Sequence, residues 1–295
     1  MSASRSPEGG PCPLCGLGPA RPLHVISGYA YVACASCGAA RLEPMPAPAE
    51  QAGLFGRGYF EGQLPGGYLD YAADEPLHRL NARDRLAVIA ADSPGACGSL
   101  LDVGCASGYF LDEARAAGWR VAGVDVSDHM RSRARRDLGL DVFADFAEAA
   151  SAGAGPFDVV TFYQVLEHMA DPLAALREAR ALLKPGGLLV IETWDRGSLL
   201  ARVSGSNWQQ LSPPSVVFVF DRPSLEALVQ RAGFGPPRIR ATSKRVRVNF
   251  AIRLLSDKMP VLMSPVARLA SRTGLGNSSF RHRLGDLITA VANPA

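Results

Sequence analysis

From residue 99 onward, short apolar runs alternate with stretches of helical spacing. The run SLLDV at 99–103 is typical of a buried strand, and YFLDEARAAG at 109–118 follows it with apolar residues on one helical face. Ser127 and Asp171 are placed to cap later helices, and KPGG at 184–187 is expected to stop the second of these. Such alternation predicts a parallel sheet covered by helices. The other expected strands are 120–126, 140–145, 157–164, 188–194 and 285–294, and a further helix is expected at 223–234.

The first third of the chain has a different organisation. A proline-rich connector, EPMPAPAE at 43–50, is expected to be extended and semi-rigid. The segment after it is expected to be mainly helical, because LHRLNARDRLAVIAA places leucines at near-helical spacing. At 295 residues the chain is long for one core and short for three. We therefore expect an N-terminal segment at 1–48, a helical cap or linker at 49–96 and a main domain at 97–295.

Composition and charge restrict the class of protein. The chain is 47% hydrophobic and 20% charged, which is ordinary for a globular protein. Its formal net charge of +3 is too small to indicate a nucleic-acid partner by itself. The start MSASRSPEGGP has no apolar core of a secretory signal, and no apolar run approaches the ~18 residues needed to cross a bilayer. These features predict a cytoplasmic protein with reduced thiols and no membrane association.

Four of the six cysteines form two C-x-x-C pairs near the N-terminus. The pairs are Cys12 with Cys15 and Cys34 with Cys37, and 18 residues separate them. Tetrahedral Zn²⁺ takes four thiolates at about 2.3 Å, and this spacing suits two knuckles that close on one ion. Because sulfur would fill every position, the predicted zinc is structural. The alternatives are a disulfide pair or a redox site, although a redox C-x-x-C is expected beside a βαβ unit.

The loop after the first predicted strand combines a carboxylate with small residues. Asp102 precedes Gly104 and Gly108, which allow a tight turn at the carboxyl end of the strand, and Cys105 and Ala106 lie between the glycines. The loop lacks both the G-x-G-x-x-G pattern and the lysine of a P-loop. A carboxylate beside a pyrophosphate would cost on the order of a kcal/mol or more, but it would attract an α-amino group. The loop therefore indicates S-adenosylmethionine, which has an amino-acid tail and no phosphate.

Acidic residues also follow the next two strands. Asp125 ends the second strand beside Val126, where an acidic side chain typically accepts both ribose hydroxyls, a feature shared with NAD enzymes. Asp145 and Phe146 follow the third strand and are placed to meet adenine through a hydrogen bond and a ring contact. The alternative is that Asp102 and Asp125 only cap strands and turns. Their order along the chain favours a cofactor site.

The stretches LLDVGCASGYFLDEARAAGWRVAGVDVS and FDVVTFYQVLEHMADPLAALREARALLKPGGLLVIETW resemble the class I S-adenosylmethionine-dependent methyltransferases. The cysteine pairs and the GYFEG…YLDY region resemble a bacterial subset with an N-terminal zinc ribbon. The resemblance implies a Rossmann-like α/β fold whose seven-stranded sheet has the order 3-2-1-4-5-7-6, with the last strand antiparallel. It implies that the region before the main domain helps to cover the cofactor. It also implies a cofactor site at Asp102, Gly104, Gly108, Asp125 and Asp145, with Gln164 near the methionine part.

Methyl transfer is an in-line displacement, so the protein mainly aligns the acceptor and excludes water. A hydroxyl or acidic carbon acceptor also benefits from a general base, which contributes ~10²–10⁴-fold. His168, just past the fourth strand, is the candidate base, with packing of the loop as the alternative; Glu167 would orient it or bind substrate. Tyr163, Trp194 and Trp208 are candidates for pocket walls or for the core.

One stretch departs from the related sequences. They often read Pro-Pro-Glu-His where this chain has Pro213-Pro214-Ser215-Val216, so both polar side chains are missing. If those side chains serve catalysis in relatives, this chain must use something else, bind a different acceptor or have lost activity.

The favoured function is methylation of a small-molecule acceptor, such as a saccharide, a lipid or a secondary-metabolite precursor, at oxygen or carbon. One alternative is an RNA methyltransferase, supported by the basic stretches at 130–137 and 238–248. Nucleic acid is the less favoured partner, because four arginines on one short helix must point mostly to water. The other alternative is an interaction protein that binds the cofactor without turnover. Neither the acceptor nor the oligomeric state follows from the sequence.

Overall fold

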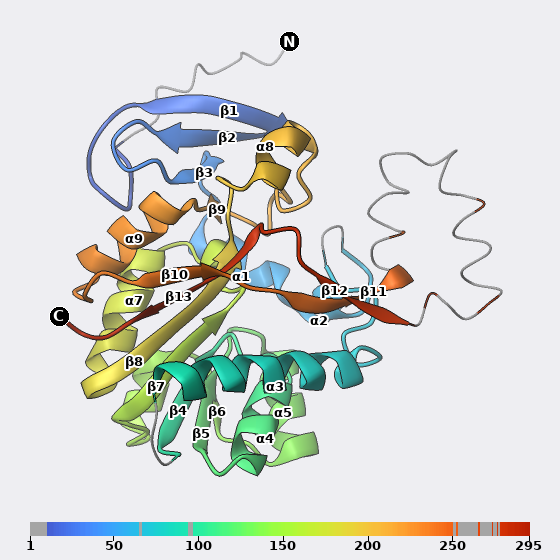
Figure 1. Ribbon diagram of the computed structural model, residues 1–295, viewed down its shortest axis with the longest axis vertical. Coiled ribbons are helices and arrows are strands. Elements are labelled where there is room, and N and C mark those ends of the chain that lie inside the picture. Colours follow the sequence, from blue (N-terminus) through green and yellow to red (C-terminus); the bar gives the residue numbers. More distant parts are fainter. Residues whose placement is uncertain are drawn as a thin grey trace.

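A seven-stranded sheet forms the centre of the protein (Figure 1). The computed structural model describes residues 11–64, 67–93, 97–249 and 278–295, and single positions 252, 265, 273 and 276. The sheet order is β10 (Arg238–Ala241), β13 (Leu287–Ala292), β8 (Leu183–Trp194), β7 (Phe157–Tyr163), β4 (Ser99–Val103), β5 (Arg120–Val124) and β6 (Val142–Phe143). Strand β13 is antiparallel to both of its neighbours, whereas β8, β7, β4, β5 and β6 are parallel. This confirms the expected order 3-2-1-4-5-7-6 and its antiparallel last strand.

Helices cover both faces of this sheet (Figure 1). One face carries α3 (Glu75–Asp92), α4 (Tyr109–Ala116) and α5 (Asp128–Leu138), and the other carries α7 (Pro172–Ala181) and α9 (Arg222–Arg231). Because successive strand residues point to opposite faces, Leu100 packs with the first group and Leu101 with the second. A strand buried on both faces reads as a continuous apolar run, as SLLDV does.

The predicted helix caps are confirmed, but one predicted helix stop is wrong. Ser127 accepts a hydrogen bond from the Met130 N–H at 3.4 Å, and Asp171 accepts one from the Ala174 N–H at 2.9 Å. The KPGG segment at 184–187 lies within β8, and α7 ends before it at Ala181. Strand pairing with β7 already begins at Leu183, and an irregularity in the register accommodates the proline and glycines.

The N-terminal segment forms a second, four-stranded sheet. Its strands are β1 (Ala20–Ile26), β2 (Tyr29–Cys34), β3 (Ala40–Glu43) and β9 (Phe218–Val219). We did not expect the fourth strand, which comes from the distant C-terminal third of the chain and pairs antiparallel with β3. One hydrophobic cluster contains Leu14 and Tyr31 together with Leu101 and Phe218. The N-terminal sheet is therefore packed on the main domain through a shared core.

The segment between the two sheets is only partly helical. It contains α1 (Pro48–Leu54), α2 (Arg57–Phe60) and α3, with an irregular stretch between α2 and α3. Near the C-terminus, β11 (Lys244–Arg247) and β12 (Ser279–His282) pair as a separate antiparallel ribbon. No described helix is long and apolar enough to cross a membrane.

Candidate active site

A cavity of about 580 Å³ lies at the carboxyl ends of β4, β5 and β7, where α1, α2 and α3 contribute to its wall. Ligand pockets typically measure roughly 300–1,000 Å³. Most of the residues expected at a cofactor and acceptor site line this one cavity: Asp102, Gly104, Cys105, Ala106, Asp125, Val126, Asp145, Phe146, Gln164 and His168. Gly108 and Glu167 do not line it.

Two glycines give the loop after β4 its shape. Gly104 has a φ of +73°, and a Cβ added there would lie 2.2 Å from a methyl carbon of Val165. Gly108, the residue before α4, has a φ of +82°, and its added Cβ would lie 2.4 Å from Leu140 Cδ1. Both positions therefore require glycine for conformation and for space. Gly108 serves the site by turning the chain into α4.

Asp125 joins the loops that follow β4 and β5. One carboxylate oxygen accepts the Ala106 N–H at 2.7 Å, and the other accepts the Ser127 N–H at 2.8 Å. Burial raises the pKa of this carboxyl, and the two N–H donors partly oppose that effect. Each oxygen keeps a further lone pair, so the carboxylate can still accept hydroxyl groups of a ligand.

Asp102 is a buried carboxylate on β4. It accepts a hydrogen bond from the Thr161 hydroxyl at 2.6 Å. Burial raises its pKa to about 7, although Thr161 and the positive charge of Arg85 act in the opposite direction. Within the described parts of the chain, no lysine or arginine forms an ion pair with it. A buried carboxylate in a cavity without such a partner suits a ligand that brings an ammonium group.

Asp145 caps a helix and lines the cavity at the same time. It precedes α6 (Phe146–Ser151) and accepts the Glu148 N–H at 2.7 Å. Its side chain is exposed, and Phe146 beside it is half-buried. The cap uses Oδ1, so the second carboxylate oxygen can still accept a hydrogen bond from a ligand.

His168 is held by the backbone of the stretch that departs from related sequences. Its Nδ1 lies 2.6 Å from the Ser215 carbonyl oxygen, which can only accept a hydrogen bond. The proton of a neutral ring is therefore on Nδ1, and Nε2 has the free lone pair. Gln51 on α1 donates to the carbonyl oxygens of both His168 and Ser215 at 3.0 Å, and Phe55 contacts the ring edge-on at 5.4 Å.

Glu167 and the two tryptophans do not line the cavity. The Glu167 carboxylate is buried and accepts a hydrogen bond from the Thr193 hydroxyl at 2.9 Å. Burial raises the pKa of Glu167. Trp194 and Trp208 are also buried, whereas Tyr163 lines the cavity. The group that orients the His168 ring is therefore a backbone carbonyl.

Helices α2 and α3 and the stretch between them contribute aromatic residues to the cavity wall, and the sequence did not assign their roles. Tyr59, Tyr71 and His78 line the cavity together with Tyr109 of α4. The Tyr71 ring stacks on His78 with centroids 4.2 Å apart and lies parallel to Tyr109 at 5.9 Å. Burial, reinforced by nearby cations, lowers the pKa of His78 to about 3, so this ring is neutral. The tyrosines of the glycine-rich stretch were the only signal in the sequence.

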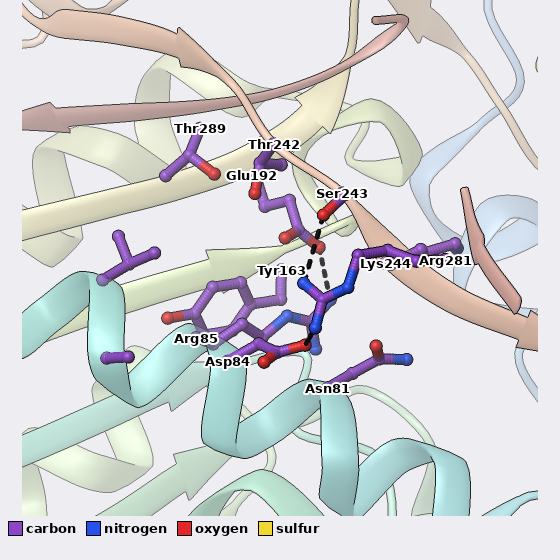
Figure 2. A pocket seen from close by; sticks show the side chains of 12 residues that line it. Asn81, Asp84, Arg85, Tyr163, Glu192, Thr242, Ser243, Lys244, Arg281 and Thr289 are labelled. Carbon is purple, nitrogen blue, oxygen red and sulfur yellow. Dashed lines mark hydrogen bonds and ion pairs between the residues drawn. The ribbon is translucent and has the colours of Figure 1, made fainter. Parts of the chain in front are cut away.

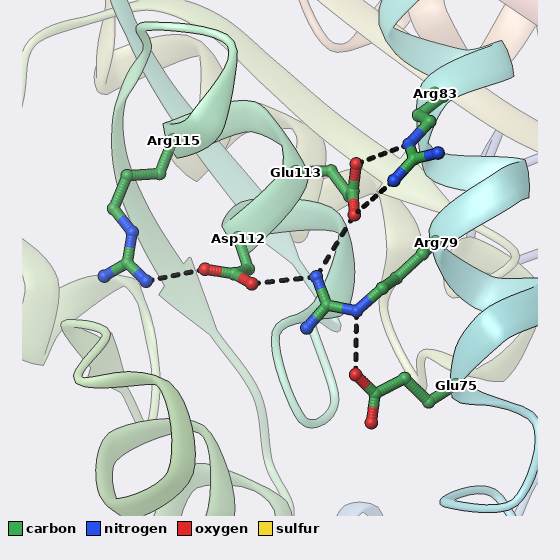
Figure 3. Close-up of polar contacts among 6 residues, drawn as sticks. All are labelled: Glu75, Arg79, Arg83, Asp112, Glu113 and Arg115. Atoms are coloured by element: carbon green, nitrogen blue, oxygen red, sulfur yellow. Dashed lines mark hydrogen bonds and ion pairs between the residues drawn. The ribbon is translucent and has the colours of Figure 1, made fainter.

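An ionic network joins α3 to α4 (Figure 3). Arg79 of α3 contacts Glu75 at 2.7 Å, Asp112 at 2.8 Å and Glu113 at 3.1 Å, so it links α3 to α4. Arg83 adds a contact to Glu113 at 2.7 Å. These contacts hold α3 against α4 beside the cavity.

The four N-terminal cysteines form a cluster that could hold a metal ion. All four sulfur atoms lie within 4.8 Å of one another. The Sγ atoms of Cys12 and Cys37 are 3.7 Å apart, and those of Cys15 and Cys34 are 3.5 Å apart. Both distances are too long for a disulfide bond of about 2.05 Å. The backbone N–H groups of Ser36 and Cys37 donate to the Cys34 sulfur, a contact that favours a thiolate.

The sheet order, with the cavity at its carboxyl edge, is that of the Rossmann-like fold of class I methyltransferases. A family model described as a methyltransferase domain matches residues 68–236, which is more than half of the chain. The chain belongs to this family of S-adenosylmethionine-dependent methyltransferases.

Curated relatives agree with this assignment. The ubiquinone biosynthesis O-methyltransferase of Ralstonia nicotianae is 33% identical over 178 residues, which cover 56% of this chain and 74% of the relative. The protein of the same name from Cereibacter sphaeroides is 33% identical over 148 residues, which cover 46% of this chain and 60% of the relative. The chain thus spans part of the length of each relative.

Solved structures share the fold at low sequence identity. A SAM-dependent methyltransferase from Archaeoglobus fulgidus has a TM-score of 0.50 at 18% identity, over 76% of this chain and 98% of that one. The plantazolicin methyltransferase BamL, in complex with a desmethyl analogue and SAH, has a TM-score of 0.51 at 14% identity, over 76% and 88%.

Proposed function

We propose that this protein transfers a methyl group from S-adenosylmethionine to an oxygen atom of a small-molecule acceptor. The observation that carries the proposal is that Asp102, Asp125 and His168 line one cavity. The name of the curated relatives, which are O-methyltransferases, supports oxygen as the acceptor atom.

The charges around Asp102 suit the amino-acid end of the methyl donor. Asp102 would bind the α-amino group, and Arg85, the cation that acts on Asp102, would face the α-carboxylate. Asp125 would accept the ribose hydroxyls, and Asp145 with Phe146 would meet the adenine. When bound, S-adenosylmethionine supplies a methyl group that its sulfonium has already activated.

His168 is the proposed general base. Its Nε2 would accept the proton of the acceptor hydroxyl, and the Ser215 carbonyl would stabilise the imidazolium that results. The missing Glu and His side chains of the Pro213–Val216 stretch are not needed for this role, because the backbone supplies the contact. The aromatic cap over the cavity would exclude water from the reaction.

The four-cysteine cluster is proposed to bind structural Zn²⁺. Four cysteine sulfur atoms within 4.8 Å of one another match the four thiolates that this ion takes, and no open position would remain for chemistry. We propose the same division of the chain as before: a zinc ribbon at 1–48, a cap at 49–96 and the methyltransferase domain at 97–295.

The contacts of the basic stretches support a small acceptor over RNA. On α5, Arg131 pairs with Asp128 at 3.2 Å, and Arg136 pairs with Asp137 at 2.8 Å. In the second stretch, Arg238 pairs with Asp92 of α3 at 3.0 Å. Arginines that neutralise acidic residues of the same chain offer less charge to a phosphate backbone.

Replacement of His168 tests the proposal. We expect His168→Ala to lower the turnover of 4-methylcatechol, a probe with two phenolic hydroxyls, by about 10²–10⁴-fold, because the base is lost. The affinity for S-adenosylhomocysteine should stay within about twofold, because the ring contacts the acceptor side. Turnover is followed by product mass spectrometry, and His24→Ala, in the N-terminal sheet, is the control. Equal turnover by His168→Ala and the parent at saturating probe would contradict the role.

A further inference from the structure

Figure 2 shows residues that line a side pocket of about 170 Å³, and this pocket shares part of its wall with the main cavity. The two hollows share Asn81, Arg85, Tyr163 and Lys244 in their walls. The rest of the side pocket includes the hydroxyl residues Thr242, Ser243 and Thr289. Two carboxylates also line it, and each is paired with an arginine of the same wall: Asp84 with Arg281 and Glu192 with Arg85. Because it has less than a third of the volume of the main cavity, it suits one polar group of a ligand.

Two cations, Arg85 and Lys244, line the wall that the side pocket and the main cavity share, and they differ in their partners. Arg85 forms an ion pair with Glu192, and its guanidinium lies 4.2 Å from the centre of the Tyr163 ring. Lys244 donates to the Gln164 side-chain oxygen at 2.6 Å and lies 4.9 Å from the centre of the Trp194 ring. No carboxylate in the described ranges forms an ion pair with Lys244.

Each carboxylate near Lys244 already has a partner. Glu192, Glu167 and Asp286 are the acidic groups that act on the lysine charge. Glu192 is paired with Arg85 and Asp286 with His282, and Glu167 accepts a hydrogen bond from Thr193. Burial, together with Arg85, outweighs these acids and lowers the pKa of Lys244 to about 8. The charged form of Lys244 would therefore be stabilised most by a ligand that carries a negative charge.

The two cations act on the charges of different carboxylates. Arg85 is the cation that acts on Asp102, which is the proposed site of the amino-acid tail. Lys244 acts on Glu167, the residue before His168 in the chain, and it lines the main cavity together with His168. Gln164 links Lys244 to the end of β7 and also donates to Glu192 at 2.8 Å.

We propose that Lys244, with the hydroxyl-lined side pocket, binds an anionic oxygen group of the methyl acceptor, either a carboxylate or a phosphate. The inference rests on the proposed function, because it assigns the acceptor end of the same cavity. It predicts that the natural acceptor is an acidic small molecule, anchored by its anionic group while His168 faces the hydroxyl to be methylated.

Probe binding to the complex with S-adenosylhomocysteine tests the inference by calorimetry. Benzoate, phenyl phosphate and benzyl alcohol are the probes, which share a ring and differ in charge. We expect at least one anionic probe to bind about tenfold or more tightly than benzyl alcohol, since a charged hydrogen bond is gained. The tighter of the two identifies the group as a carboxylate or a phosphate. In Lys244→Met and Lys244→Gln, the preference should fall to within about twofold.

Controls separate this inference from the proposed function. Lys184→Met removes a lysine that pairs with Asp158 at 2.7 Å, outside both hollows, and it should keep the preference. Equal binding or no binding of the three probes by the parent complex would overturn the inference, as would a preference that persists without Lys244. A tenfold loss of S-adenosylhomocysteine affinity in both Lys244 variants would also overturn it, because Lys244 would then serve the cofactor. Failure of the parent to bind S-adenosylhomocysteine would refute the proposed function itself and this inference with it.

Discussion

At the scale of one residue, burial makes the charge of Asp102 sensitive to its surroundings. Its carboxyl lies inside the sheet with one hydrogen bond, from Thr161, and burial raises its pKa to about 7. A ligand ammonium favours the charged form, so binding would lower this pKa and release a proton wherever Asp102 is protonated beforehand. The affinity of such a ligand must then depend on pH.

We expect the affinity for S-adenosylhomocysteine to fall by up to about tenfold per pH unit below pH 7 and to level off above it, because Asp102 becomes neutral as pH falls. Asp102→Asn should bind about tenfold or more weakly at pH 8 and lose most of this dependence. Calorimetry between pH 5.5 and 8.5 measures both effects, with the exposed Asp141→Asn as the control. A flat profile for the parent would show that Asp102 does not meet the ammonium.

The sequence predicted site residues where a side chain carries the chemistry. The carboxylates and glycines at the ends of β4 and β5 could be placed because parallel strands bring their carboxyl ends to one edge. The Ser215 carbonyl could not, because any residue has one and its use depends on tertiary contact. For the same reason Glu167 was expected to orient His168, whereas the ring nitrogen bonds to the backbone.

At the scale of elements, the N-terminal sheet holds the stretch that orients His168. The Tyr31 hydroxyl on β2 donates to the Val216 carbonyl at 2.6 Å, and the Leu42 N–H on β3 donates to the Val217 carbonyl at 2.9 Å. The residue before Val216 is Ser215, which contacts His168. The position of the proposed base is therefore coupled to the N-terminal sheet.

This coupling was not visible in the sequence. Strand β9 is two residues long, and its partner β3 lies far away along the chain, so local periodicity gives no signal. The KPGG segment was predicted to end a helix, because proline and glycine usually do so. It lies instead within β8, which pairs with β7 both before and after these residues. The longer apolar strands and the capped helices were predictable because burial and capping leave local patterns.

Metal content tests the account of this sheet. We expect about one zinc ion per purified chain, and Cys34→Ser should lose most of it and lower the unfolding temperature by about 5 °C or more, because a structural metal contributes folding energy. Emission spectroscopy and calorimetry measure the two quantities. Cys97→Ser, at an exposed cysteine outside the cluster, should change neither. A Cys34→Ser variant with full metal content would rule out the four-sulfur site.

At the scale of the whole molecule, the cavity is a product of three regions. The sheet edge supplies the carboxylates, the cap supplies the aromatic cover, and β11 supplies Lys244. The second basic stretch pairs with acidic residues of α3, Arg238 with Asp92 and Arg245 with Asp84, and these pairs dock β10 and β11 against that helix. Much of the positive charge of the basic stretches is therefore neutralised within the chain, which is consistent with a small acceptor and not with RNA.

The most direct test of the account is a calorimetric titration of the parent protein with S-adenosylhomocysteine and, separately, with NAD. If the carboxylate of Asp102 receives an amino-acid tail, S-adenosylhomocysteine will bind with a stoichiometry of one per chain and NAD will give no binding heat. Tight binding of NAD, with no heat from S-adenosylhomocysteine, would contradict the account at its foundation.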